Sequence, residues 1–333
     1  MLQIADGNNV NCITMRKLII LLILTAAFNK AFAQTYPDAR LPTNVPQLFT
    51  EGRLSDGLSN RDFTISPKGD EIFYTLQQPR FVTSTIIRLL KKNGRWGLPE
   101  VAPFSGKYRD LEAAFSPDGS TIYFSSDRPL IGSAIKKDFD IWRVKKSPNG
   151  KWGEPENLGN NVNSDKSEFY PSITRSGNLY FTAELADGKG SEDIVVCKPT
   201  GNSGYSKPEI LPEDINTKYD EFNAFVDPGE QFIILTSDGR PDNLGRGDLY
   251  ISHKDKAGNW LPVKHVPAPI NSTAIDYCPF VTWDKKYLVF TSSRLNAGFN
   301  DGKTKNYSQL KQLLGSAGNG WDDIYWVKFD MNW

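Results

Sequence analysis

Five degenerate copies of one short segment constrain the fold of this chain more than any other feature of its sequence. The copies read FTISPKGDEIFYT (63 to 75), AAFSPDGSTIYFSS (113 to 126), PSITRSGNLYFTA (171 to 183), NAFVDPGEQFIILTS (223 to 237) and PFVTWDKKYLVFTSS (279 to 293). Their equivalent positions are taken as Ser66, Ser116, Thr174, Val226 and Thr282, which gives spacings of 50, 58, 52 and 56 residues. Repetition at such a period indicates a solenoid, a propeller or another array.

Each copy has the chemistry of a β-hairpin. In the second copy, Ser116 suits the first position of a type I turn, Pro117 fixes φ at the second, and Gly119 suits the fourth. The following run Ile122-Tyr123-Phe124 is a short apolar segment suited to a buried strand.

A second hairpin follows each copy. Its first strand starts with an acidic residue in four of the five copies: Asp140-Ile141-Trp142, Asp193-Ile194-Val195, Asp248-Leu249-Tyr250 and Asp323-Ile324-Tyr325. A Gly- or Asn-rich turn before an aromatic residue and one more short strand complete the unit, as in residues 149–158. Four antiparallel strands in each unit predict a propeller blade.

The two ends of the chain indicate how the ring closes. The fifth copy stops at Asn332-Trp333, where the other copies begin their last strand, and Pro46-Gln47-Leu48-Phe49 is a candidate for the missing strand. We therefore predict an all-β fold, a five-bladed β-propeller of four-stranded antiparallel blades whose last blade is completed by an N-terminal strand. Residues 34–333 are expected to form this single domain.

Three features resemble a known repeat family. The SPDG turn, the SSDR strand end and the Asp-Ile-Trp or Asp-Ile-Tyr strand start are similar to the WD40-like repeats of TolB-type periplasmic proteins, over about residues 60 to 330. The resemblance implies a peptide or protein partner that engages the channel mouth. Some copies depart from the pattern, since the fifth lacks the turn glycine and the first has Ser84-Thr85-Ile86 where the others place Asp.

The N-terminus has the pattern of a secretory signal. From Met15 the chain reads MRKLIILLILTAAFNKAFAQ, with two basic residues, an apolar run and a small-residue site that predicts cleavage near Ala33. Residues 1–33 are thus assigned to a signal region, which predicts a periplasmic or secreted protein without a membrane span after its removal. A retained anchor is the alternative, although the apolar run is short for a bilayer.

Composition and motifs argue against several functional classes. The chain has 39 basic and 39 acidic residues, so its charge suits neither nucleic acid nor an anionic membrane as partner. It has two histidines, without the spacing of a metalloprotease, and no P-loop, dinucleotide fingerprint or G-x-S-x-G elbow. We expect a monomer with no cofactor, metal or assigned catalytic residue. Cys197 and Cys278 lie in different repeats, and only proximity in space would let them pair.

Charged residues are expected to gather on one face of the ring. Inner strands start, second strands end and third strands start on this face, which also has the long connections where binding sites usually occur. The candidate binding residues at the channel mouth are Asp110, Glu168, Asp220, Glu221 and Asp276 at inner-strand starts, with Asp127, Arg128, Arg240 and Arg294 at second-strand ends.

Two interpretations of these acids stay open. They could converge on a cation, a basic peptide or a sugar, or each could pair with a neighbouring arginine or accept hydrogen bonds between blades. For the repeated Asp of the third strand, repetition favours the structural role. Residues 306–314 suit a short amphipathic helix that either caps the channel or packs on its own blade.

The main hypothesis is a non-catalytic propeller that binds a protein, peptide or cell-envelope partner, such as a cell-wall component, on its charged long-loop face. The alternative is a carbohydrate-active enzyme, a glycosidase or polysaccharide lyase, that uses channel-facing carboxylates; at the level of architecture it resembles some arabinan-degrading enzymes. Regularly repeated acids argue against catalysis, because catalytic pairs need different environments to hold different pKa values.

Overall fold

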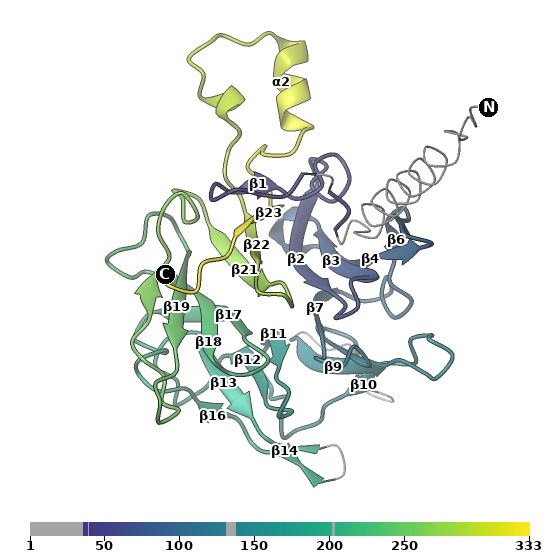
Figure 1. Cartoon of the computed structure of the whole chain (residues 1–333), viewed down its shortest axis with the longest axis vertical. Coiled ribbons are helices and arrows are strands. Elements are labelled where there is room, and N and C mark those ends of the chain that lie inside the picture. Colours follow the sequence, from purple (N-terminus) through teal and green to yellow (C-terminus); the bar gives the residue numbers. More distant parts are fainter. Residues whose placement is uncertain (1–35, 39, 131–137, 202–203) are drawn as a thin grey trace, which may run out of the picture. The chain divides into compact units, whose positions relative to one another are not determined.

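Five antiparallel sheets surround a common axis in residues 40–333 (Figure 1). The computed structural model describes residues 36–38, 40–130, 138–201 and 204–333, and the predicted signal region lies outside these residues. Among the residues that the structure describes, no helix is long and apolar enough to cross a membrane.

The sheets confirm the prediction of an all-β, five-bladed propeller with four strands in each blade. Blade 1 contains β2 (Ser59–Ile65), β3 (Glu71–Gln77), β4 (Ser84–Lys92) and β6 (Glu100–Val101), and β5 (Arg95–Trp96) pairs with the end of β4. Blade 2 contains β7 (Asp110–Phe115), β8 (Thr121–Ser126), β9 (Asp140–Lys145) and β10 (Glu156–Asn157). Blade 3 contains β11 (Glu168–Ile173), β12 (Leu179–Ala183), β13 (Asp193–Cys197) and β16 (Glu209–Ile210).

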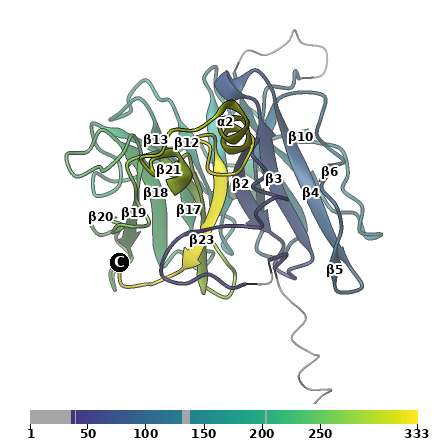
Figure 2. The same cartoon turned by 90° about the horizontal axis from the view of Figure 1, so that it is seen from above.

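The remaining two blades follow the same order. Blade 4 contains β17 (Asp220–Val226), β18 (Phe232–Asp238), β19 (Asp248–His253) and β20 (Lys264–His265), and blade 5 contains β21 (Asp276–Val281), β22 (Tyr287–Ser292), β23 (Asp323–Lys328) and β1 (Gln47–Leu48). A short ribbon of β14 (Pro199–Thr200) and β15 (Gly204–Tyr205) extends from blade 3. Figure 2 shows β2, β3 and β4 side by side, from the axis outward.

The ring closes as the chain ends predict. Strand β1 pairs antiparallel with β23, with Gln47 opposite Trp326 and Leu48 opposite Tyr325. Phe49 is fully buried, and its ring centroid lies 4.9 Å from that of Phe63 in blade 1 and 5.0 Å from that of Trp326 in blade 5. The N-terminal strand therefore joins the last blade to the first through a shared aromatic core.

Aromatic side chains fill the space between neighbouring blades. Between blades 1 and 2, the ring of Phe73 lies 5.5 Å from that of Phe115 and 6.1 Å from that of Trp152. These residues belong to one buried cluster that draws on strands of both blades. Burial of such large rings is a main source of the stability of the ring of blades.

The hairpin turns explain the missing glycine of the fifth copy. Gly119 has a φ of 72°, and Glu230 and Lys285 adopt φ values of 54° and 56° at the same turn position. The Tyr180 hydroxyl donates to Glu230 at 2.6 Å, and the Lys285 ammonium lies 2.8 Å from an Asp227 carboxylate oxygen. Glu230 thus links blade 4 to blade 3, and Lys285 links blade 5 to blade 4. These contacts offset the strain of a positive φ at a non-glycine residue, which is about 1–2 kcal/mol.

The turns also correct the alignment of the fourth copy by one residue. Ser66, Ser116, Thr174 and Thr282 each donate their backbone N–H across the turn, and in blade 4 the residue that does so is Asp227, not Val226. Pro228 follows Asp227 as Pro117 follows Ser116, so this proline was the available signal for the correct alignment.

Every inner strand has a bulge at the same place. The register with the second strand shifts there, and one non-glycine residue has a positive φ: Asp62 (56°), Glu112 (61°), Tyr170 (53°), Asn223 (48°) and Cys278 (51°). A bulge changes the direction of a side chain. We call these five residues the bulge ring, because they meet around the axis.

The longest connection contains the expected short helix. Helix α2 (Tyr307–Leu314) begins with a capping box between Asn306 and Gln309 and stands clear of the sheets (Figure 1). A 3-10 turn, η3 (Ala297–Phe299), precedes it. None of the residues of α2 is buried, and none lines the cavity described below.

Candidate functional site

Three of the acids predicted at inner-strand starts are buried in ion pairs with the predicted arginines. Asp110 is fully buried, and the Arg128 Nη2 donates to its carboxylate at 2.6 Å. The equivalent distances are 2.8 Å from Arg240 to Glu221 and 2.6 Å from Arg294 to Asp276. Burial raises the pKa of Asp110, and Arg128 opposes that shift.

The same arginines hold the backbone of the segment that enters each blade. Arg128 donates from Nε to the Ser126 hydroxyl at 2.9 Å and from Nη2 to the Phe104 carbonyl at 3.0 Å. The matching bonds in blades 4 and 5 involve Ser237 with the Ile215 carbonyl and Ser292 with the Ile270 carbonyl. We call this arrangement the Ser–acid–Arg unit. It matches the second interpretation of these acids, in which each one pairs with a neighbouring arginine.

A further repeated signal was missed in the sequence. The segments Val162-Asn163-Ser164, Ile215-Asn216-Thr217 and Ile270-Asn271-Ser272 each precede an inner-strand acid by the same interval. The hydroxyl of Ser164 donates to Glu168 at 2.6 Å, as Thr217 does to Glu221 at 2.8 Å. Asn163, like Asn216 and Asn271, bonds both the N–H and the carbonyl of the residue after the third-strand Asp. In these three connections the hydroxyl residue bonds the blade that the segment enters, and the asparagine bonds the third strand of the blade before it.

The other predicted residues also have partners within the chain. Asp127 accepts from the Nε of Arg109 at 2.7 Å, and Asp220 accepts from the backbone N–H of Ser191 at 2.9 Å. None of the nine predicted residues lines the cavity at the channel mouth. Their role in binding a partner stays a prediction, and the structure gives each of them a bond to its own chain.

A cavity of about 450 Å³ lies at the channel mouth, on the face of the inner-strand starts. All five blades contribute to its wall. Its aromatic lining consists of Phe81, Phe169, Phe222, Tyr277 and Trp321, and its charged lining consists of Arg61, Arg80, Glu112, Glu192 and Asp322. A pocket of this size and composition is typical of small-ligand sites.

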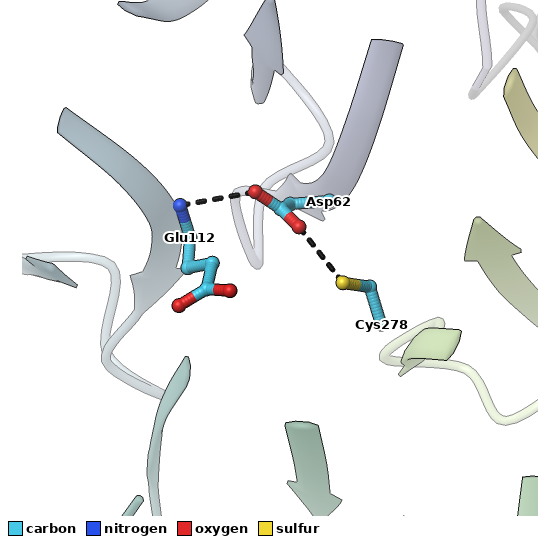
Figure 3. A group of neighbouring side chains, drawn as sticks. All are labelled: Asp62, Glu112 and Cys278. Carbon is cyan, nitrogen blue, oxygen red and sulfur yellow. Dashed lines mark hydrogen bonds between the residues drawn. The ribbon is translucent and has the colours of Figure 1, made fainter. Parts of the chain in front are cut away.

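The bulge ring forms the floor of this cavity, whose lining includes its residues Glu112 and Asn223. Figure 3 shows three members of the ring, Asp62, Glu112 and Cys278. The backbone N–H of Glu112 donates to an Asp62 oxygen at 3.1 Å, and the Cys278 thiol donates to the other at 2.9 Å. Across the axis, the Asn223 amide donates to Glu112 at 3.3 Å and the Tyr170 hydroxyl donates to the Pro279 carbonyl at 2.9 Å. The last two bonds join blades 2 and 4 and blades 3 and 5, which are not neighbours, so they cross the axis and close the channel.

Arg61 supplies the positive charge of this floor. Its guanidinium lies 2.9 Å from Asp62 and 2.6 Å from Glu112, and it donates to the Cys278 sulfur at 3.3 Å. Asp62, Glu112 and Cys278 are ligand types close enough to suit a metal ion. The guanidinium already occupies the position of the cation, so the group does not fit a metal.

The thiols of the described chain are buried and free. Cys278 lies in the floor and Cys197 in the core of blade 3, and neither forms a disulfide. Burial raises the pKa of both thiols, chiefly because a thiolate is costly away from water.

Two acids of the cavity have raised pKa values. Burial, with smaller contributions from Asp220 and Glu184, raises the pKa of Glu192 to about 7, and Arg61 opposes this shift. Burial also raises the pKa of Glu112, which Arg61 again opposes. Glu112 accepts hydrogen bonds from the Tyr170 N–H and the Ser125 hydroxyl, whereas the Glu192 side chain has no such partner among the described residues.

Beyond the floor, the channel is nearly filled. The space on the side of the hairpin turns measures about 40 Å³ and is lined mainly by apolar residues, among them Phe63, Phe280 and Trp283. The cavity at the mouth is therefore blind, open to ligands from one face only.

The lining residues were missed because they vary among the copies. Just before and at each bulge the pairs are Arg61-Asp62, Leu111-Glu112, Phe169-Tyr170, Phe222-Asn223 and Tyr277-Cys278. The neighbouring acid, hydroxyl and turn positions recur from copy to copy. Variation inside an otherwise repeated strand was the available signal.

Neither protein-family models nor curated protein sequences yield a match to this chain. Among solved structures, it is similar to an alpha-L-arabinofuranosidase from Lactobacillus brevis, with a TM-score of 0.49 and 13% identity over 84% of this chain and 92% of that one. An exo-1,5-alpha-L-arabinanase from a bovine ruminal metagenomic library gives a TM-score of 0.47 and 10% identity over 84% and 97% of the two chains.

A puromycin-hydrolyzing peptidase from Mycobacterium tuberculosis gives a TM-score of 0.40 and 12% identity, and the match covers 70% of this chain and 34% of that one. At these values the likenesses assign no activity to this chain.

Proposed function

We propose that this protein binds one end of a carbohydrate chain in the cavity at its channel mouth. The observation that carries the proposal is a blind cavity with aromatic walls and a polar, charged floor. Sugar rings present C–H faces that pack on aromatic rings, and their hydroxyls bond to amide, carboxylate and guanidinium groups. Phe169, Phe222 and Trp321 suit the first contact, and Asn223 and Glu192 suit the second.

The closed floor restricts how a polymer is bound. Because the bulge ring fills the axis, a chain has no route through the propeller and enters by its end. The predicted periplasmic or secreted location would bring the cavity into contact with polysaccharides of the cell envelope or its surroundings. The sequence predicted a binding site formed by nine charged residues on the long-loop face. This proposal places the binding site in the cavity on the same face.

The wall residues provide the test. We expect Phe222→Ala to weaken the binding of an oligosaccharide by about 3–10-fold, because one aromatic contact is worth roughly 0.5–1.5 kcal/mol. Titration calorimetry against a panel of oligosaccharides measures this effect. The matched control is Tyr307→Ala on α2, which removes an aromatic ring that is 81% exposed and lies outside the cavity.

The same measurements distinguish a carbohydrate ligand from a peptide ligand. Absence of binding to every oligosaccharide, or equal losses in Phe222→Ala and Tyr307→Ala, would refute the proposal. Capture of a peptide by the wild type, with that binding lost in Phe222→Ala, would instead favour the protein-binding hypothesis.

Hydrolysis of the bound sugar is a second candidate function, favoured by two carboxyl groups in one cavity. Glu192 has a pKa of about 7, suited to a general acid, and Asp322 accepts one hydrogen bond, from the Ser59 hydroxyl at 2.9 Å. Turnover of a polysaccharide by the wild type, lost in Glu192→Gln even at saturating substrate, would establish it. Binding without turnover across the panel would leave a non-catalytic protein.

A further inference from the structure

We propose that the sugar at the bound chain end carries a free amine, whose ammonium group pairs with the Glu192 carboxylate. This inference rests on the proposed function and specifies its ligand as a carbohydrate with an unacetylated amino group. It assigns to Glu192 the role of a specificity-determining residue.

The first observation is that the Glu192 side chain lacks a partner among the described residues. It lines the cavity directly before β13 and is half-buried, yet its carboxylate forms no hydrogen bond or ion pair with any residue that the structure describes. Carboxylates in such positions are normally paired, because burial of an unpaired charge is costly. A cation on the ligand would supply the missing partner.

The second observation is the charge of the surroundings. Among the described residues, three carboxyl groups line the cavity against two guanidinium groups, and Asp62 adds another carboxyl group behind Arg61. Arg61 is held in the floor by Asp62 and Glu112, so its charge is already balanced there. The cavity therefore favours a positive ligand group over a neutral or negative one.

The groups that face Glu192 agree with this charge. Asp220 of β17 and Glu184 after β12 disfavour its ionised form, and Arg61 of β2 favours it. An ammonium ion at Glu192 would stabilise the ionised carboxylate and release its proton at neutral pH. The aromatic walls add to the preference, since cations are attracted to ring faces within about 6 Å.

Three matched oligosaccharides test the inference. They are β-1,4-linked oligomers of glucosamine, of N-acetylglucosamine and of glucose, which differ at one carbon in carrying an amine, an amide or a hydroxyl. At pH 7.5 we expect the glucosamine oligomer to bind the wild type at least about tenfold more tightly than the other two, as a charge-assisted contact predicts.

Glu192→Gln is the decisive variant. We expect it to abolish the preference for the amine, so that the glucosamine and glucose oligomers bind the variant with similar affinity, because the uncharged amide bonds an amine and a hydroxyl alike. Glu184→Gln is the control, since Glu184 lies outside the lining and pairs with Lys166. It should keep the preference. Urea unfolding confirms that both variants are folded.

The outcomes separate this inference from the proposed function. Equal binding of the three oligomers to the wild type would overturn the amine assignment and leave carbohydrate binding intact. An amine preference that survives in Glu192→Gln would overturn the role of Glu192. Failure of any oligosaccharide to bind the folded wild type would overturn both.

A pH series gives a second readout. Since the amine binds the ionised carboxylate, we expect its advantage over the glucose oligomer to fall as the pH drops from 7.5 to 5.5, where Glu192 holds its proton. The same series on Glu192→Gln should be flat. An advantage that stays constant in the wild type would contradict the pairing.

Discussion

The acids of the Ser–acid–Arg units and the residues of the bulge ring lie on the same inner strands, but they differ in how closely they repeat among the blades. The units recur in blades 2, 4 and 5 with nearly identical bonds, whereas the bulge ring has a different residue in every blade. Each unit lies within its own blade, so the same three residue types can recur without contact between the copies. Residues of the bulge ring meet one another on the axis, where five identical acids would repel.

This difference shows where function is expected in a degenerate repeat. Positions that recur among the copies build the blade, and positions that vary within a repeated strand build the shared centre. The cavity lining follows the second rule, with Arg61, Phe169, Phe222 and Tyr277 at equivalent places before the bulge.

The largest effect is expected in a Ser–acid–Arg unit. Arg128→Ala should lower the free energy of unfolding by about 3–5 kcal/mol, because it leaves the Asp110 carboxylate buried without its cation. Urea denaturation measures this loss. Arg109→Ala breaks a partly exposed pair with Asp127 and should cost about 1 kcal/mol or less. Equal losses in the two variants would contradict the assigned structural role.

An opposite and smaller effect is expected at Glu192. Its pKa in the folded protein is about 7, raised from 4.5, so the folded state holds the proton more tightly than the unfolded state does. The stability that this proton contributes is present below the unfolded pKa and is lost as the pH rises through 7. Glu192→Gln should therefore stabilise the protein by about 1–3 kcal/mol at pH 8 and by little at pH 4.

Urea denaturation of both proteins at these two pH values checks the prediction. Glu184→Gln, which removes an exposed acid paired with Lys166, is measured alongside as the control for the loss of a carboxylate. A stability difference between wild type and Glu192→Gln that is the same at pH 4 and pH 8 would show that Glu192 ionises normally.

The smallest effect on stability is expected at the rim of the cavity. Trp321 is 47% exposed, so Trp321→Ala should change the free energy of unfolding by only about 0.5 kcal/mol or less. It should nonetheless weaken oligosaccharide binding by about 3–10-fold, as loss of one aromatic contact predicts. Calorimetry and urea denaturation on the same sample compare the two losses. A destabilised variant with unchanged binding would place Trp321 in the core instead.

Local patterns allowed much of the fold to be predicted. Turn chemistry at Ser116-Pro117-Asp118-Gly119 and the short apolar runs after each turn indicated hairpins, and their number indicated five blades. The candidate site was predicted less well, because the same strands also carry acids that bond within the blade. Nothing in the spacing of Asp110 or Asp276 distinguishes a carboxylate facing a channel from one facing an arginine.

By itself, the sequence determined the repeat, the four-stranded unit and the strand Pro46-Gln47-Leu48-Phe49 that closes the ring, since all of these follow from local turn and strand preferences. Only the tertiary structure decided what lies at the axis. The bulge turns one side chain of each inner strand inward, and whether five such side chains attract or repel depends on their meeting in space. That meeting closes the channel and makes a blind cavity of the mouth, in which the Glu192 side chain has no partner among the residues that the structure describes.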